Sequence, residues 1–584
     1  MNPTTCQFML ILDGSTLPTN NLVGSKARNL SQMVALGLPV PPAFAITTQA
    51  WQKYFSTGRF SSQLVSVVDE GIDYIELKTG RGFGGVDSPL LVSVRSGSPV
   101  SMPGMMDTML NVGMNDETEI ALAAENGNGS FARETHRCFC EMYARIVLRS
   151  LPIKLDPKGE PPAWRATIKE LCNDVVPNSP REQLYGAVRS VFDSWNSARA
   201  KRYRQHYDIS EQMGTAVIIQ AMVFGNADAN SGTGVVFSRN PLTGDHGCFG
   251  EYLVQAQGED VVSGSHTPNP LSRLQEIVPT AHAQLLSAAA RLEQEHRAVQ
   301  DIEFTVERGQ LFFLQSRSAR CSADAEVRIA VDFVREGMLT EDQALKRISV
   351  EQVRKLLRPR LAAKVNTKRL EPLIVGEAAS PGTSIGVVML DTDSARTLVT
   401  QGKSVILARP TTSPLDLQAM LGVAAVITER GGSTSHAAVI CRQLVIPCVV
   451  GCGEGALTGL SGLEVTVDGT SGRIYSGALP LEQPNESDNP NLAQLSLWAK
   501  SRSPIGVDSL ETPIPFDALD LDGIAGGDDI EQTLHLLKGV RAAMGSVLNT
   551  EAGVRAAIAA GVQNIFVRQV LPTLLVACTL GPEN

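Results

Sequence analysis

The chain has 584 residues, too many for one hydrophobic core, and at about 150 residues per domain it predicts three or four folded units. Hydrophobic residues make up 43% and charged residues 19%, as in a globular protein. The net charge of -10 argues against nucleic acid bound across a broad basic surface, but it leaves room for an anionic small molecule held by a few local cations.

The sequence shows no targeting or membrane-spanning signal. The first residues, MNPTTCQFMLILDGS, have no basic residues before their apolar stretch, so we do not predict a signal peptide. No run of about 18 apolar residues predicts a membrane span. The 10 cysteines are scattered, and even Cys448 and Cys452 lie in the apolar string PCVVGC. We interpret them as reduced thiols of a cytoplasmic protein.

The first half of the chain mixes strand and helix patterns. Residues 1–115 alternate short β-like runs with helical patterns, and 117–210 are mostly helical. Residues 214–262 turn to β-like runs separated by Gly, Asn and Pro. After a helical stretch at 280–297, DIEFTVERGQLFFLQSR predicts a hairpin that turns at Arg308–Gly309.

The second half has two α/β segments joined by connectors. A charged helical connector is predicted over roughly 324–370, and a compact α/β unit follows to about 482. The Pro-, Asn- and acid-rich residues 483–492 predict a linker. Residues 493–584 again alternate strand and helix patterns.

Several motifs in the first half suit phosphate groups. Lys26 follows Gly-Ser at the start of a predicted helix, where backbone N–H groups and the helix dipole favour anions, although an isolated lysine is more often a solvated surface residue. Arg95 ends a β-like run and can bind phosphate bidentately. The Met-rich loop SMPGMMDT, with Gly104 and Thr108, either closes over phosphates or forms a buried turn with methionines as core filler.

The predicted hairpin carries a candidate metal site. Glu303 and Gln315 lie on facing strands and could share one Mg²⁺, which prefers oxygen ligands. Arg317 is two residues past Gln315, so it points to the same face and could neutralise charge on a transferring phosphoryl group. The alternative is an ordinary polar cross-strand pair.

These segments resemble the pyruvate, phosphate dikinase family. The matching strings are VSVRSGSPVSMPGMMDTMLNVGMND, GTAVIIQAMVFGN, SGTGVVFSRNPLTGD, GEYLVQAQGEDVVSG and QDIEFTVERGQLFFLQSRSAR. The resemblance implies an ATP-grasp-like fold in which Lys26 and Arg95 hold phosphates, Glu303 and Gln315 hold Mg²⁺, and Arg317 holds the terminal phosphate. It further implies that adenine is flanked by Gln220, Met222 and Val223. The chain departs from the family in reading GSKA where Gly-Gly-Lys-Gly is usual, and in a short helical insert.

The most specific string is GGSTSHAAVICRQLVIPCVVG, which contains His436. Ser and Thr before a run of helix formers predict an N-cap, which puts His436 in the first helical turn. The positive helix end disfavours imidazolium and would stabilise a phosphate attached to the ring. A lone histidine at a helix start would more often be a structural core residue.

The family has this string nearly intact, with the histidine as phosphoryl carrier. The resemblance implies a phosphohistidine domain that swings between two sites, with hinges near 340–370 and 483–492. Thr434 matches a threonine whose phosphorylation switches off plant members. In SPLD we expect Ser413 as N-cap, Pro414 at the first helical position and Asp416 at the third.

The resemblance sets the expected fold class and division: α/β and α+β multidomain, with a bipartite ATP-grasp-like nucleotide-binding domain, a phosphohistidine swivelling domain and a short C-terminal α/β remnant. The expected boundaries are 1–340 for the nucleotide-binding domain with a helical insert at about 117–210, 341–370 for the connector, 371–482 for the carrier domain, 483–492 for the linker and 493–584 for the remnant.

The family's pyruvate-binding barrel is mostly missing. After the linker about 95 residues follow, against about 250 for a (β/α)₈ barrel. Arg568 weakly matches a barrel arginine, but Val570 stands where an acid is usual, and Cys578 does not match the barrel's cysteine motif.

We therefore expect an ATP-dependent phosphotransferase that phosphorylates His436, releases AMP and uses Mg²⁺. Inorganic phosphate and a small acceptor such as pyruvate or phosphoenolpyruvate are the expected partners, without nucleic acid or membrane. A partner chain, a homo-oligomer, and a catalytically degenerate regulatory or scaffold protein stay open as alternatives.

Overall fold

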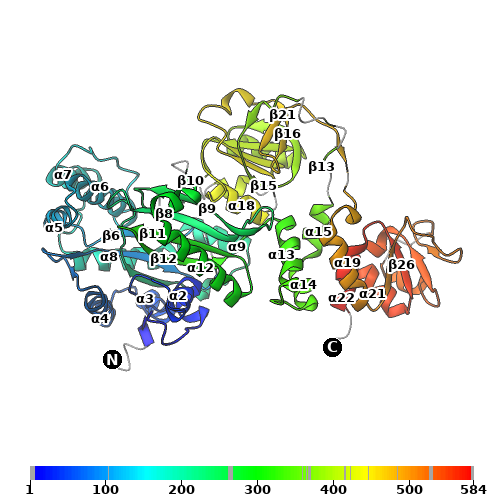
Figure 1. The fold of residues 1–584 in the computed structure, drawn as a ribbon, viewed down its shortest axis with the longest axis horizontal. Coiled ribbons are helices and arrows are strands. Elements are labelled where there is room, and N and C mark those ends of the chain that lie inside the picture. Colours follow the sequence, from blue (N-terminus) through cyan, green and yellow to red (C-terminus); the bar gives the residue numbers. More distant parts are fainter. Residues whose placement is uncertain are drawn as a thin grey trace.

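The computed structural model describes residues 7–100, 102, 104–258, 260, 268–357, 360–362, 365, 370–412, 416–420, 422–444, 446–482, 484–524 and 530–580. An N-terminal unit (residues 7–318) and a C-terminal unit (residues 490–580) lie at opposite ends of the long axis, and a central unit (residues 370–480) stands beside them (Figure 1). The mixture of sheets and helices is the α/β and α+β multidomain fold that we predicted.

The N-terminal unit contains two five-stranded antiparallel sheets. The first has the order β1-β2-β7-β5-β6. Its strands are β1 (Met9–Ile11), β2 (Ala43–Ile46), β7 (Ala216–Ala221), β5 (Val92–Gly97) and β6 (Thr108–Val112). The accompanying helices are α2 (Asn20–Ala35), α3 (Thr48–Thr57) and α4 (Ser62–Thr79), with the short pair β3 (Gly82–Phe83) and β4 (Pro89–Leu90).

The second sheet, with the order β10-β9-β8-β11-β12, contains the predicted hairpin. Its strands are β10 (Asn269–Pro270), β9 (His246–Val254), β8 (Gly232–Arg239), β11 (Gln300–Glu307) and β12 (Gln310–Ser318), and its helices are α11 (Ser272–Ile277) and α12 (Pro279–His296). Arg308 and Gly309 both have positive φ, as a two-residue hairpin turn requires. The register pairs Glu303 with Gln315, which puts both predicted metal ligands opposite one another.

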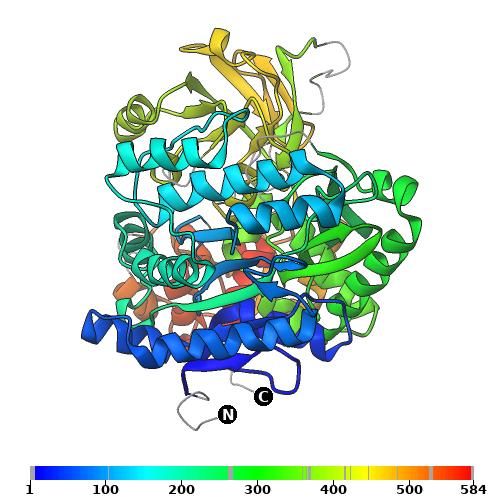
Figure 2. The same ribbon diagram turned by 90° about the vertical axis from the view of Figure 1, so that its left-hand side faces the viewer.

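The predicted helical insert forms five helices over the first sheet. They are α5 (Asp116–Asn126), α6 (Gly129–Ile146), α7 (Pro161–Cys172), α8 (Pro180–Ser194) and α9 (Ala198–His206), followed by the 3₁₀ turn η1 (Glu211–Met213). Polar caps explain several starts, because the side chains of Asn115, Asn128, Ser179 and Ser197 each accept a hydrogen bond from a first-turn N–H. Figure 2 shows light-blue to cyan helices in front of the strands.

The central unit is built on one eight-stranded mixed sheet, with the order β14-β21-β20-β16-β17-β18-β19-β15. The strands are β14 (Ile374–Val375), β15 (Glu377–Ser380), β16 (Thr383–Met389), β17 (Val405–Arg409), β18 (Ala425–Thr428), β19 (Cys448–Val450), β20 (Glu464–Asp468) and β21 (Arg473–Ser476). The helices are α16 (Thr392–Thr400), α17 (Leu417–Met420), α18 (His436–Leu444) and the 3₁₀ turn η3 (Thr458–Leu460). The predicted cap positions Ser413 and Pro414 lie outside the described residues.

The segments on either side of the central unit differ from flexible linkers. Helices α13 (Ala323–Arg335), α14 (Glu341–Arg347) and α15 (Val350–Leu356) share a hydrophobic core with the C-terminal unit. The strands β13 (Arg360–Leu361) and β22 (Leu481–Glu482) then pair antiparallel, so the chain enters and leaves the central unit through one ribbon. The predicted linker contains the 3₁₀ turn η4 (Glu486–Asp488) and the start of α19 (Pro490–Arg502). Helix α19 begins there because the Asn489 side chain caps its first turn.

The C-terminal unit is an open, four-stranded parallel sheet with the order β23-β26-β25-β24. Its elements are β23 (Gly506–Ser509), β24 (Leu519–Asp520), α20 (Ile530–Leu536), β25 (Ala542–Met544), η5 (Ser546–Asn549), α21 (Glu551–Ala560), β26 (Asn564–Val567) and α22 (Val570–Leu580). Four strands cannot close a parallel barrel, so α19 and α22 cover the sheet and pack on one another.

In the described part of the chain, no helix combines the length and apolar character needed to cross a membrane. The cysteines there are all free.

Candidate active site

One large cavity gathers nearly every residue that the sequence singled out. Its volume is about 1710 Å³, and both the N-terminal and the central unit line it. The predicted residues on its wall are Lys26, Arg95, Gly104, Thr108, Gln220, Met222, Val223, Glu303, Gln315, Arg317, Thr434 and His436. Arg568 is not on this wall.

Lys26 is placed by a kink in α2. Gly24 has φ 78°, and a Cβ there would lie 2.2 Å from the carbonyl oxygen of Gly97, so the turn packs directly on the end of β5. Lys26 follows in the first turn after the kink. The pKa of Lys26 is lowered to about 8, first by burial and then by the charges of Arg95 and Arg317, while Glu303 acts in the opposite direction. An anion entering the cavity would relieve this repulsion between cations.

Arg95 joins the two sheets at the hairpin. Its guanidinium donates to the Glu303 carboxylate at 3.2 Å, to the side-chain oxygen of Gln315 at 3.0 Å and to the carbonyl of Leu314 at 3.2 Å. The Gln315 amide also donates to Glu303 at 3.2 Å. The two predicted metal ligands therefore present oxygens to one point between the sheets.

These residues fit a magnesium ion that is completed by waters and phosphates. The carboxylate oxygen of Glu303 and the amide oxygen of Gln315 that both accept from Arg95 suit a cation that binds oxygen and keeps several waters. Among the described residues, no group of three or more His, Cys, Asp or Glu side chains forms a metal centre, so a protein-only cage is not present there.

Arg317 has a partner that our sequence analysis missed. Asp301 is 5% exposed and accepts a hydrogen bond from the Arg317 Nε at 2.8 Å. This carboxylate raises the pKa of Arg317, which keeps the guanidinium charged. The alternation of side chains along the predicted strand could have indicated this partner, because Asp301 is two residues before Glu303 and lies on the same face.

The predicted adenine-flanking residues line another part of the wall. Gln220 is buried in β7, and its amide donates to the carbonyl of Pro41 at 3.2 Å. Met222 and Val223 follow directly after the strand and line the cavity with it. A polar strand end beside two apolar side chains can accept a flat heterocycle.

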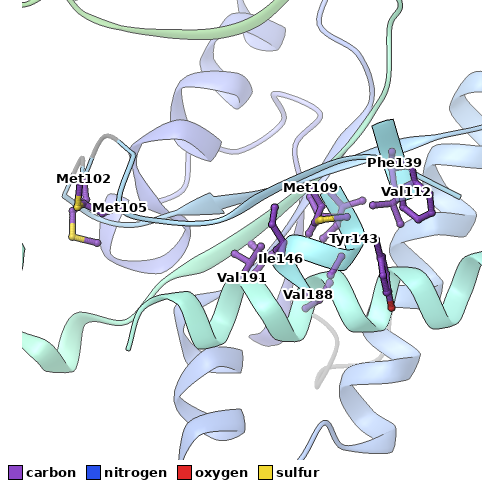
Figure 3. Close-up of a cluster of buried hydrophobic side chains, with 14 of the residues drawn as sticks. Met102, Met105, Met109, Val112, Phe139, Tyr143, Ile146, Val188 and Val191 are labelled. Carbon is purple, nitrogen blue, oxygen red and sulfur yellow. The ribbon is translucent and has the colours of Figure 1, made fainter. Parts of the chain in front are cut away.

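The Met-rich loop buries its methionines and also borders the cavity. Met102, Met105 and Met109 are 6%, 3% and 0% exposed, and Figure 3 shows Met109 near Ile146, with Met102 and Met105 at a separate place on the loop. Gly104 between them has φ 70° and lines the cavity. Ser101 and Pro103 lie outside the described residues.

Arg199 fixes the end of this loop. The Nε of Arg199 donates to the Met105 carbonyl at 3.0 Å, and Arg199 also forms an ion pair with Asp107. The two contacts tie the loop to α9, where the sequence offered no sign of a partner.

His436 enters the cavity from the central unit. It is the first residue of α18, where Ser435 accepts a hydrogen bond from the Ala438 N–H at 3.5 Å. Both ring nitrogens are buried, and neither has a hydrogen-bond partner in the described part of the chain. Burial lowers the pKa of His436, and Asp416 acts in the opposite direction. A neutral imidazole with free nitrogens is the nucleophilic form.

A carboxylate on the N-terminal unit binds the turn that precedes His436. Glu251, 7% exposed on β9, accepts hydrogen bonds from the Ser433 hydroxyl at 2.9 Å and from the Thr434 hydroxyl at 2.6 Å. A Cβ at Gly432 would lie 2.6 Å from the same carboxylate, so the close approach requires glycine. Sequence analysis missed Glu251, because no local pattern links residues so far apart in the chain.

Arg568 lies in the C-terminal unit, away from this cavity. It is exposed just after β26, and its charge helps hydrogen bonds from Ser546 to lower the pKa of Asp522. The structure thus brings the predicted ATP and histidine residues together and leaves the weak acceptor candidate apart.

Comparisons with known proteins agree with this geometry. The family description "Pyruvate phosphate dikinase, AMP/ATP-binding domain" matches residues 20–81 and 60–276, and "PEP-utilising enzyme, mobile domain" matches residues 401–472. Pyruvate, phosphate dikinase of Clostridium symbiosum is 39% identical over 518 residues, covering 82% of this chain and 59% of the relative. That of Rhizobium meliloti is 38% identical over 539 residues, covering 84% and 60%.

The same relation reaches a eukaryote. Pyruvate, phosphate dikinase of Entamoeba histolytica is 38% identical over 526 residues, covering 83% of this chain and 59% of the relative. The chain thus spans about three fifths of the length of the curated relatives it matches. With both family descriptions placed on the two units that line the cavity, the chain belongs to the pyruvate, phosphate dikinase family.

Proposed function

We propose that the chain transfers a phosphoryl group from ATP to His436 and releases AMP. The observation that supports this most is that His436, from the central unit, opens into the same cavity as the cations and carboxylates of the N-terminal unit. A nucleophile with two free ring nitrogens thus faces a wall suited to phosphates.

The proposed roles follow from the contacts. Lys26, Arg95 and Arg317 bind the phosphates, and Asp301 keeps Arg317 charged. Glu303 and Gln315 hold Mg²⁺, which would neutralise phosphate charge during transfer. Gln220, Met222 and Val223 flank adenine, and Gly104 and Thr108 border the phosphates from the loop.

Atom balance requires an acceptor besides His436. Release of AMP breaks the bond between the α- and β-phosphates, so two phosphoryl groups leave the nucleotide. If one stays on His436, inorganic phosphate can take the other as pyrophosphate. We propose these as substrate and product, in line with the relatives, which are named for pyruvate and phosphate.

The second acceptor is a small molecule such as pyruvate. The open four-stranded sheet that carries Arg568 is too small to form a closed barrel site. We propose that residues outside this sheet, such as those of a partner chain, complete the acceptor site. A cytoplasmic location suits both the ATP supply and the free thiols.

Intact mass tests the carrier. Wild type incubated with Mg²⁺ and ATP labelled at the β-phosphate should gain an acid-labile, base-stable label and release AMP. His436→Ala should gain none. Equal labelling of both proteins would refute the carrier, and no labelling of either would favour a degenerate regulatory or scaffold relative.

A further inference from the structure

A second side chain of the central unit lines the same cavity as the carrier histidine. Thr412 follows β17 and lines the same cavity as His436. Its hydroxyl oxygen is buried and has no hydrogen-bond partner among the residues that the structure describes, and the same is true of both ring nitrogens of His436. Buried polar groups are rarely left unpaired, so an orphan hydroxyl on a cavity wall indicates a ligand group.

The neighbouring hydroxyls already have partners. Ser433 and Thr434 both donate to Glu251, at 2.9 and 2.6 Å. Ser435 caps α18 by accepting from the Ala438 N–H. Thr412 is therefore available for a ligand where these three are engaged.

The backbone before Thr412 is held in place. The N–H groups of Glu429 and Arg430 donate to the carbonyls of Arg409 and Pro410, at 3.1 and 3.0 Å. Arg409 also pairs with Asp416 at 3.3 Å. These contacts tie the Thr412 segment to the chain that leads into the His436 helix, so the two side chains keep their relation within one unit.

We propose that Thr412 donates a hydrogen bond to the phosphoryl group carried on His436. This rests on the proposed function and deepens it. An imidazole nitrogen forms the N–P bond to the β-phosphorus while the bond from that phosphorus to the AMP oxygen breaks, and AMP leaves with that oxygen. The γ-phosphoryl group then passes to inorganic phosphate as pyrophosphate, which leaves one phosphoryl group on His436. The new phosphoryl oxygens are strong acceptors, and the Thr412 hydroxyl supplies the donor.

Thr412 belongs to the same unit as His436, which gives it a role that the phosphate-binding cations lack. Lys26, Arg95 and Arg317 belong to the N-terminal unit and stay there when the central unit moves away. Thr412 and the N-terminal end of α18 belong to the central unit, so they travel with the phosphohistidine. Thr412 therefore stabilises the phosphohistidine between the two sites.

The experiment compares Thr412→Val, which keeps the shape but removes the hydroxyl, with Thr412→Ser, which retains it. Thr411→Val is the matched control, because Thr411 lines the same cavity but its hydroxyl is not among the buried orphan atoms. Each variant is incubated with fixed ATP, AMP, phosphate, pyrophosphate and Mg²⁺, and the phosphoenzyme is measured at equilibrium. ATP affinity and the lifetime of nucleotide-free phosphoenzyme are measured alongside.

A hydrogen bond to a charged group corresponds to about a ten- to hundredfold change in equilibrium. Thr412→Val should lower the ratio of phosphorylated to free enzyme by that factor and shorten the phosphoenzyme lifetime, with unchanged ATP affinity. Thr412→Ser should restore both. If wild type is labelled but Thr412→Val and Thr411→Val have the same ratio of phosphorylated to free enzyme, this inference alone is overturned. Absence of label on His436 in wild type would overturn the proposed function and this inference together.

Discussion

Glu251 offers the sharpest test of how the two units meet. It is on the N-terminal unit, yet its carboxylate accepts two hydrogen bonds from the residues just before His436, at 2.9 and 2.6 Å. It does not line the cavity, so its removal should leave the nucleotide contacts intact. We therefore expect Glu251→Ala to weaken the docking of the central unit without weakening ATP binding.

The magnitude follows from the two bonds. A hydrogen bond to a charged group contributes about 1.5 to 3 kcal/mol, and the freed hydroxyls regain water once the units separate, so about 3 kcal/mol in total is reasonable. When docking limits the reaction, this lowers the rate of His436 phosphorylation about a hundredfold. Glu251→Gln keeps the shape and loses the charge, so its rate should fall between those of Glu251→Ala and wild type.

Single-turnover labelling from ATP measures the rate, and equilibrium dialysis measures ATP affinity. A wild-type rate in Glu251→Ala would show that this contact does not position His436. A large drop in melting temperature or in ATP affinity would instead make Glu251 structural.

Four further outcomes are expected. Glu303→Ala should abolish labelling of His436 while shifting the melting temperature little, because Arg95 keeps its contacts to Gln315 and Leu314; strong destabilisation would contradict this. The value of kcat/KM for ATP should fall as pH rises through about 8, because Lys26 then loses its proton, and Lys26→Arg should remove that fall. If kcat/KM of the Lys26→Arg variant still falls at the same pH, another group is responsible for the fall. Thr434→Asp should be far slower than Thr434→Val, since the new carboxylate faces Glu251, and Glu251→Gln should recover part of the loss; equal rates would refute the electrostatic account. The purified chain should not form phosphoenolpyruvate from ATP, phosphate and pyruvate in a coupled assay; robust turnover would mean that the C-terminal unit contains a complete acceptor site.

Local patterns were sufficient for much of the candidate site. A two-residue turn predicts the hairpin, but its regular register would pair Glu303 with Leu314, and a bulge between Glu303 and Phe304 shifts the partner to Gln315. Ser435 before a run of helix formers set the start of α18 at His436. The hairpin turn and the helix start are both local features, and short-range hydrogen bonds and side-chain periodicity decide them.

Contacts between distant segments needed the tertiary structure. Glu251 meets Thr434 across two units, and nothing in either string indicates the other. The predicted hinge helices proved to share a core with the C-terminal unit, because their apolar faces are buried only when α19 and α22 lie against them. The burial of the Thr412 hydroxyl, without a hydrogen-bond partner among the described residues, likewise depends on how distant segments pack. The sequence by itself indicated which groups suit phosphate chemistry, because charge, side-chain type and local caps are properties of short strings; only the packing of separate units decided which of them line one cavity with the histidine.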